Sequence, residues 1–66
     1  MTSFKELRVK SGLTQDQLAV KSQVPRICIS RYETGKYYPT MANAIKLAKA
    51  LGVTIDELIE AKEQAS

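Results

Sequence analysis

Apolar residues recur at spacings of three and four along almost all of this 66-residue chain, which is the spacing of amphipathic helices. Short polar or glycine-containing segments separate the apolar runs. Together with their capping residues, these runs predict helices over residues 3–11, 14–22, 25–34, 40–51 and 54–64. The sequence therefore predicts an all-α fold, a compact five-helix bundle, with residues 1–66 forming a single domain.

Capping residues set the limits of these helices. A hydroxyl side chain is followed three residues later by Glu or Gln at Ser3–Glu6, Thr14–Gln17 and Thr54–Glu57. Each pair matches a capping box, in which the two side chains satisfy the first unpaired N–H groups of a helix. Glycine, which accepts a left-handed backbone, stands where three helices should end, at Gly12, Gly35 and Gly52. Pro25 opens the third helix.

The inward face of each helix gives one small core. A chain of this size buries only about 60% of its unfolded surface, so association with a second copy is an expected source of stability. The residues expected to face inward are Phe4, Leu7, Leu18, Ala19, Val24, Ile29, Tyr32, Met41, Ala44, Ile45, Leu47, Ala48, Leu51, Ile55, Leu58 and Ile59.

The second and third predicted helices are short and joined by a tight turn, with Val24 filling the turn. This is the plan of a helix-turn-helix, which places its second helix in the DNA major groove. On a helical wheel centred on Ile29, the far side carries Ile27, Ser30, Arg31 and Thr34, and Arg26 lies on the flank. This outward face is the candidate reading surface.

Charge is divided unevenly along the chain. The net charge is +3, but residues 1–52 carry nine Lys or Arg against three acidic residues, and residues 53–66 carry one Lys against four. The division suggests a basic face toward a polyanion and an acidic last helix turned away from it, although a solvated mixture of charges has the same composition. The charged N-terminal run MTSFKELRVK has no apolar core, which predicts a cytoplasmic protein without signal peptide or membrane anchor.

Three segments resemble a known family: LRVKSGLTQDQLAVKSQV, ISRYETGKYYPT and IKLAKALGVTIDEL. In order and spacing they are similar to the phage repressor and Cro-type (XRE-like) helix-turn-helix family, which also includes restriction-modification controllers and small antitoxins. The similarity covers residues 4 to about 60. It implies a lambda-repressor-like bundle that binds double-stranded DNA as a transcriptional regulator, usually a two-fold homodimer on a near-palindromic operator.

Four residues are candidates for reading bases: Arg26, Ile27, Ser30 and Arg31. An arginine offers a planar fork to guanine O6 and N7, and neither arginine has an obvious carboxylate on its outward side. Arg31 lies outermost, whereas Arg26 suits either a base or a phosphate. Ile27 suits a thymine methyl group, although single exposed apolar residues are also ordinary.

Five residues are candidates for DNA phosphates: Thr14, Gln15, Thr34, Lys36 and Tyr38. Thr14 and Gln15 begin the second helix, where unpaired N–H groups and the helix dipole favour an anion; the family resemblance implies the same role for Gln15. The alternative is that Thr14 only caps and Gln15 is solvated. Of Tyr37 and Tyr38, one is expected to pack and the other to donate to a phosphate, and the sequence does not separate them.

Three further positions carry structural expectations. The resemblance implies a buried ion pair between Arg8 and Glu33; the alternative is two separate surface charges. Gln23 stands where the family usually has glycine, and a left-handed backbone there costs up to about 1 kcal/mol. The lone Cys28 excludes an internal disulfide and is expected to act as a small, half-buried apolar residue rather than a redox switch.

The last helix, 54–64, carries more apolar residues than one core face needs, so we expect a homodimer through Val53, Ile55 and Ile59. With no histidine, no metal cluster and no glycine-rich phosphate loop, the chain is not expected to be an enzyme or to bind a cofactor, a metal or a small-molecule ligand. The alternative function is an antitoxin-like or antirepressor-like protein-interaction module on the same scaffold.

Overall fold

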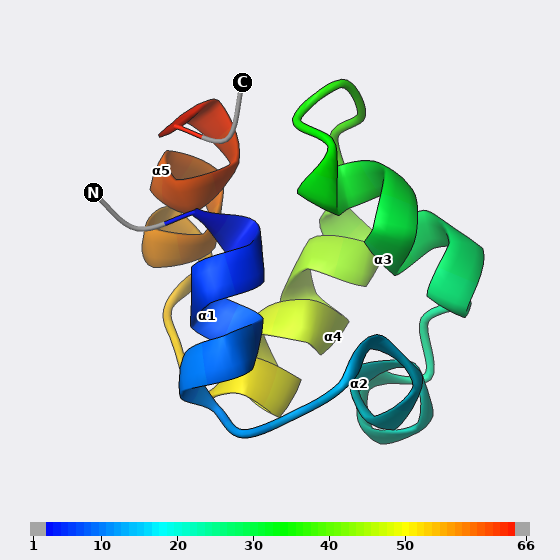
Figure 1. Cartoon of the computed structure of the whole chain (residues 1–66). Helices are drawn as coiled ribbons and strands as arrows, with labels where there is room; N and C mark the ends of the chain where they lie inside the picture. The colour runs from blue at the N-terminus through cyan, green and yellow to red at the C-terminus, as the bar shows by residue number, and fades with distance from the viewer. Residues whose placement is uncertain (1–2, 65–66) are drawn as a thin grey trace.

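The computed structural model describes residues 3–64, which form five α-helices and no strand (Figure 1). The helices are α1 Phe4–Lys10, α2 Gln15–Ser22, α3 Arg26–Glu33, α4 Met41–Leu51 and α5 Ile55–Gln64. Each begins and ends within one residue of the range expected from the sequence, so the all-α prediction is confirmed. Within residues 3–64, the helices are too short or too polar for any of them to span a membrane.

Local hydrogen bonds explain why the helices start where they do. At α2 the capping box is complete, since Thr14 Oγ1 accepts from the Gln17 amide at 3.1 Å and Gln17 Oε1 accepts from the Thr14 amide at 2.9 Å. At α1, Ser3 Oγ accepts from the Glu6 amide at 3.2 Å. Pro25 precedes α3 and supplies no capping side chain, but its carbonyl accepts from the Cys28 amide at 3.0 Å and the Ile29 amide at 3.2 Å, which starts the helix at Arg26.

The helix α4 occupies the middle of the bundle. It packs against α2 and α5, while α2 also packs against α3, and α1 contacts both α3 and α5. Figure 1 shows α3 and α5 on opposite sides of α4. The exposed acidic residues Asp56, Glu57 and Glu60 belong to α5, the helix across α4 from α3.

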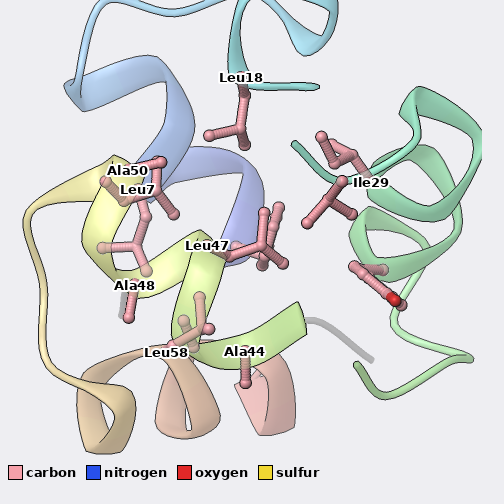
Figure 2. Packing of buried hydrophobic residues seen from close by; sticks show 13 residues of the cluster. Leu7, Leu18, Ile29, Ala44, Leu47, Ala48, Ala50 and Leu58 are labelled. Atoms are coloured by element: carbon pink, nitrogen blue, oxygen red, sulfur yellow. The ribbon is translucent and has the colours of Figure 1, made fainter. Parts of the chain in front are cut away.

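The core gathers around Leu47 of α4, which is fully buried. In Figure 2, Leu47 lies between Leu18 of α2, Ile29 of α3 and Leu58 of α5. Because every helix contributes to this one cluster, none of them is stabilised alone. The buried apolar residues are Phe4, Leu7, Leu18, Val24, Ile29, Tyr32, Ala44, Leu47, Ala48, Ala50, Leu51, Leu58 and Ala61.

The predicted core was wrong at three residues, which are exposed. Met41 is 64% exposed, Ile59 is 41% exposed and Ile45 is 38% exposed. The buried arc of α4 is centred on Ala44, Leu47, Ala48 and Leu51, so Met41 and Ile45 fall on its flank. Periodicity shows that a helix has an apolar face, but the neighbouring helices decide which part of that face they cover.

The turn between α2 and α3 keeps a left-handed residue without glycine. Gln23 has φ +61° and is the one non-glycine residue with positive φ in the described part of the chain. Its amide donates to the Ala19 carbonyl at 2.9 Å. The neighbouring Ser22, which is buried, donates from Oγ to the Leu18 carbonyl at 2.7 Å and accepts from the Val24 amide at 3.3 Å. These bonds hold the two helices in a fixed relation despite the cost of the backbone at Gln23.

Candidate nucleic-acid interface

One face of α3 is exposed and carries the candidate reading residues. Arg26, Ile27 and Arg31 are exposed, with Ile27 at 59%, and Ser30 is half-buried. The opposite face is anchored by Ile29 and Tyr32, both buried. The structure thus brings the four candidate base-reading residues together on one outward surface.

Contacts around Tyr32 fix the rotation of α3. Its ring meets the Phe4 ring edge-on with centroids 6.2 Å apart, and its hydroxyl accepts from Asn43 Nδ2 at 3.1 Å. A buried tyrosine with a satisfied hydroxyl has one favoured orientation. Asn43 is thus a positioning residue that periodicity did not single out, because its partner lies eleven residues away on another helix.

The expectation that Arg26 has no nearby carboxylate was wrong. Arg26 Nε lies 2.9 Å from Asp16 Oδ1, so an ion pair joins the first turns of α3 and α2. Both side chains are well exposed, at 62% and 78%. Such pairs contribute about 0–1 kcal/mol, so a guanine or a phosphate competes effectively for the guanidinium.

Arg31 has a partner of a different kind. Its Cζ lies over the Tyr37 ring, 5.6 Å from the centroid, within the range of a cation–π contact. Thr34 ties the intervening loop, because its hydroxyl donates to the Arg31 carbonyl at 2.6 Å and accepts from the Lys36 amide at 3.3 Å. Among the residues that the structure describes, Arg31 therefore has an aromatic face as its partner and forms no ion pair.

The candidate phosphate ligands occupy two places. Thr14 and Gln15 lie at the start of α2, whereas Thr34 and Lys36 lie at and just after the end of α3, and Thr14, Thr34 and Lys36 are exposed. Tyr38 is 66% exposed and lines an apolar groove against α5. The structure therefore places Tyr37 beside Arg31 and Tyr38 at the groove, a separation that the sequence did not provide.

Behind this surface, Arg8 and Glu33 form a nearly buried ion pair with 11% and 9% of their side chains exposed. Arg8 Nε lies 2.6 Å from Glu33 Oε2, and Arg8 also donates to the Leu13 carbonyl at 2.8 Å. Gln15 Nε2 donates to Glu33 Oε1 at 3.1 Å, so it is half-buried rather than solvated. The network joins α1, the start of α2 and the end of α3.

The expected dimer residues differ in exposure. Val53 and Ile55 are half-buried and pack against the core, whereas Ile59 is 41% exposed. Ile55 and Ile59 line an apolar groove of about 200 Å³, which Val53 does not line. The sequence did not anticipate that Tyr38, Pro39 and Met41 form the other wall of this groove.

Cys28 is half-buried on the flank of α3 and packs against the core, with no disulfide. Within residues 3–64, no group of three or more His, Cys, Asp or Glu side chains is arranged to hold a metal ion. The exposed residues of α3, the start of α2 and the loop after α3 offer arginine, hydroxyl and amide donors and an isoleucine side chain. These are the groups that meet base edges and phosphates.

The chain is similar to helix-turn-helix proteins over most of its length. A model of the family described as Helix-turn-helix matches residues 4–58. The chain is 44% identical over 60 residues to the HTH-type transcriptional activator BcrR of Enterococcus faecalis, covering 91% of this chain but only 29% of that protein. It is 40% identical over 57 residues to an uncharacterized HTH-type transcriptional regulator of Archaeoglobus fulgidus, covering 86% of this chain and 81% of that protein. It is also 42% identical over 45 residues to the cryptic phage CTXphi transcriptional repressor RstR of Vibrio cholerae, covering 68% of this chain and 40% of that protein.

Proposed function

Because the chain belongs to the helix-turn-helix family of transcriptional regulators, we propose that it binds double-stranded DNA sequence-specifically, as a homodimer on a near-palindromic operator. The outward face of α3 is the observation that carries this proposal. It presents Arg26, Ile27, Ser30 and Arg31 on one helix that is anchored on its other side. Arginine and serine donate to base edges, and isoleucine suits the thymine methyl group.

Phosphate contacts fix the protein on the duplex in this proposal. Thr14 and Gln15 approach one strand from the start of α2, and Thr34, Lys36 and Tyr38 contribute from the far end of α3 and the loop that follows. The Gln15 amide nitrogen carries two N–H groups, and one of them is used by Glu33. The second N–H group donates to a phosphate, so that Gln15 links the DNA backbone to the buried ion pair.

Selection of bound sequences from a random duplex library tests this function, with the wild-type protein and Arg31→Ala at two salt concentrations. We expect a paired motif whose half-sites lie about 34 Å, or 10–10.5 bp, apart. Arg31→Ala should relax the motif at one or two bases and cost about 1–3 kcal/mol of discrimination there. Absence of any enriched motif would overturn the proposal.

The homodimer forms through α5 and the apolar groove in this proposal, with Ile55 and Ile59 at its centre and Val53 at its edge. The occupant is a second copy, because a two-fold operator requires two α3 helices in fixed relation. Ile59→Asp should convert a dimer to a monomer in sedimentation equilibrium without DNA. Val9→Asp is the matched control, since Val9 is 57% exposed on α1 and lies outside the groove. A monomer mass that is constant up to high micromolar wild-type concentration would refute the dimer.

We propose repression as the sign of control and the cytoplasm as the compartment. A dimer on an operator that overlaps a promoter blocks transcription by occupying the site, whereas activation needs an additional contact with the transcription machinery. A reporter with the selected motif placed over its promoter should lose expression when the protein is present. Increased expression would show activation instead.

The competing function, a protein-interaction module of the antitoxin or antirepressor kind, has a different signature. Binding of DNA through phosphates weakens steeply with salt, at about 0.9 units of log K per contact for each unit of log salt. Weak, salt-insensitive DNA binding would favour the module.

A further inference from the structure

The two exposed arginines of α3 are held in chemically different ways. Arg26 gives its Nε donor to Asp16 at 2.9 Å, so part of the edge that would read a base is occupied. Arg31 lies over the Tyr37 ring and contacts it through the cation rather than through an N–H donor. A guanidinium supported on an aromatic face keeps its edge donors for other partners.

Hydrogen bonds in the turn between Arg31 and Tyr37 hold the Tyr37 ring in place. The Thr34 hydroxyl bridges the Arg31 carbonyl and the Lys36 amide, and the Gly35 amide donates to the Tyr32 carbonyl at 3.2 Å. Gly35 has φ +81°, a conformation that turns the chain back and that side chains with a Cβ avoid. The loop therefore brings the Tyr37 ring back to the Arg31 side chain, which lies six residues earlier in the chain.

On these grounds we propose that Tyr37 is the positioning residue for base reading by Arg31. This inference rests on the proposed DNA-binding function and deepens it by naming what fixes the reading side chain. An arginine loses rotamer freedom when it binds a base, and a side chain already restrained loses less. Tyr37 sets the strength of the preference at the base that Arg31 reads, and the Tyr37 hydroxyl takes no part.

The test uses the selected operator and versions of it altered one base at a time, with affinities measured for the wild type, Tyr37→Phe and Tyr37→Leu. Tyr37→Phe keeps the aromatic face and should retain the full base preference. Tyr37→Leu removes the face and should lower discrimination at the Arg31 base about three- to tenfold, with other positions unchanged. Tyr37 is 51% exposed and outside the core, so both variants should keep the wild-type melting temperature.

Two controls separate this role from others. In an Arg31→Ala background, Tyr37→Leu should have no further effect on base preference, because the side chain that it positions is gone. Tyr38→Leu changes the neighbouring tyrosine, which is proposed above as a phosphate ligand, so it should weaken binding to all operators alike while the preference at the Arg31 base stays as in the wild type.

The outcomes separate a failure of the Tyr37 positioning role from a failure of the proposed DNA-binding function. If the wild type selects a motif that Arg31→Ala relaxes, and Tyr37→Leu leaves the preference intact, the function stands and the positioning role is overturned. A loss shared by Tyr37→Phe and uniform across all operators would make Tyr37 a phosphate ligand, which also overturns it. If the wild type selects no motif, or Arg31→Ala relaxes none, both Arg31 as a reader and Tyr37 as its positioning residue are refuted.

Discussion

Within the described part of the chain, two Arg–carboxylate pairs of similar length lie in different surroundings. Arg8 and Glu33 lie 2.6 Å apart with about a tenth of each side chain exposed, and Arg26 and Asp16 lie 2.9 Å apart with well over half exposed. The buried pair has further partners, since Arg8 also donates to the Leu13 carbonyl and Gln15 donates to Glu33. The exposed pair has water as its alternative partner.

Distance therefore says little about what each pair does. A buried ion pair is costly to desolvate, but removing one partner strands the other charge in a medium that solvates it poorly. An exposed pair is screened by water and salt, and its members exchange partners easily. We infer that the buried pair fixes how α1, α2 and α3 meet, whereas the exposed pair leaves Arg26 free to exchange Asp16 for another partner.

Arg8→Met should have the largest effect, because it leaves the Glu33 carboxylate buried without its cation. We expect a loss of about 3–5 kcal/mol in the free energy of unfolding, measured by urea denaturation. This is a large part of the roughly 5–15 kcal/mol that stabilises ordinary domains. The double variant Arg8→Met/Glu33→Leu is the control and should recover most of the loss. A single-variant loss below about 1 kcal/mol would abolish the contrast between the pairs.

Gln15→Leu removes the amide that donates to Glu33 Oε1 and should cost about 1–2 kcal/mol in the same measurement, since a hydrogen bond to a charged acceptor is lost. In the Arg8→Met/Glu33→Leu background the carboxylate is absent, so the same substitution should change stability little. An equal loss in both backgrounds would show that Gln15 acts through packing and not through the ion pair.

Gln23→Gly should change the free energy of unfolding less than Arg8→Met and more than Asp16→Asn, and the change should be a gain. Glycine adopts φ +61° without strain, so we expect a gain of about 0.5–1 kcal/mol after allowing for the greater freedom of glycine in the unfolded chain. Gln23→Ala retains a Cβ and should give no comparable gain. Thermal unfolding of the three proteins measures the difference, and a loss on Gln23→Gly would contradict it.

Asp16→Asn should have the smallest effect on stability, under about 0.5 kcal/mol, because the pair is exposed. The substitution also removes a negative charge beside the candidate DNA surface and releases Arg26. Affinity for DNA should therefore rise about two- to fivefold at low salt and less at high salt. A stability loss as large as that of Arg8→Met would mean that burial does not separate the two pairs.

The limits of the helices were predictable because their signals are local. Thr14 with Gln17 and Thr54 with Glu57 form their boxes within one helical turn, and no distant contact is needed to place them. The left-handed turn at Gln23 was expected only through the family resemblance, because glutamine is not itself a signal for positive φ. The exposure of Met41 was not predictable from local signals, because it depends on which part of the apolar face of α4 the neighbouring helices cover.

For the same reason, the periodicity of apolar residues could not predict the partners of the two exposed arginines. Asp16 is ten residues before Arg26, and their contact depends on the angle at which α2 and α3 meet. Tyr37 reaches Arg31 only because the loop turns back at Gly35. A helical wheel shows which way a side chain faces, but not which loop or neighbouring helix it meets there.

Cys28 is a chemical probe for the separation of α3 from the rest of the bundle. It is the single thiol of the chain, half-buried on the flank of α3 and packed against the core. Packing against the core covers part of the sulfur, so a thiol reagent reacts faster when α3 lifts from the bundle, and the increase in modification rate reports such openings. Comparing that rate with global unfolding distinguishes a helix that detaches alone from one that leaves only when the whole protein unfolds.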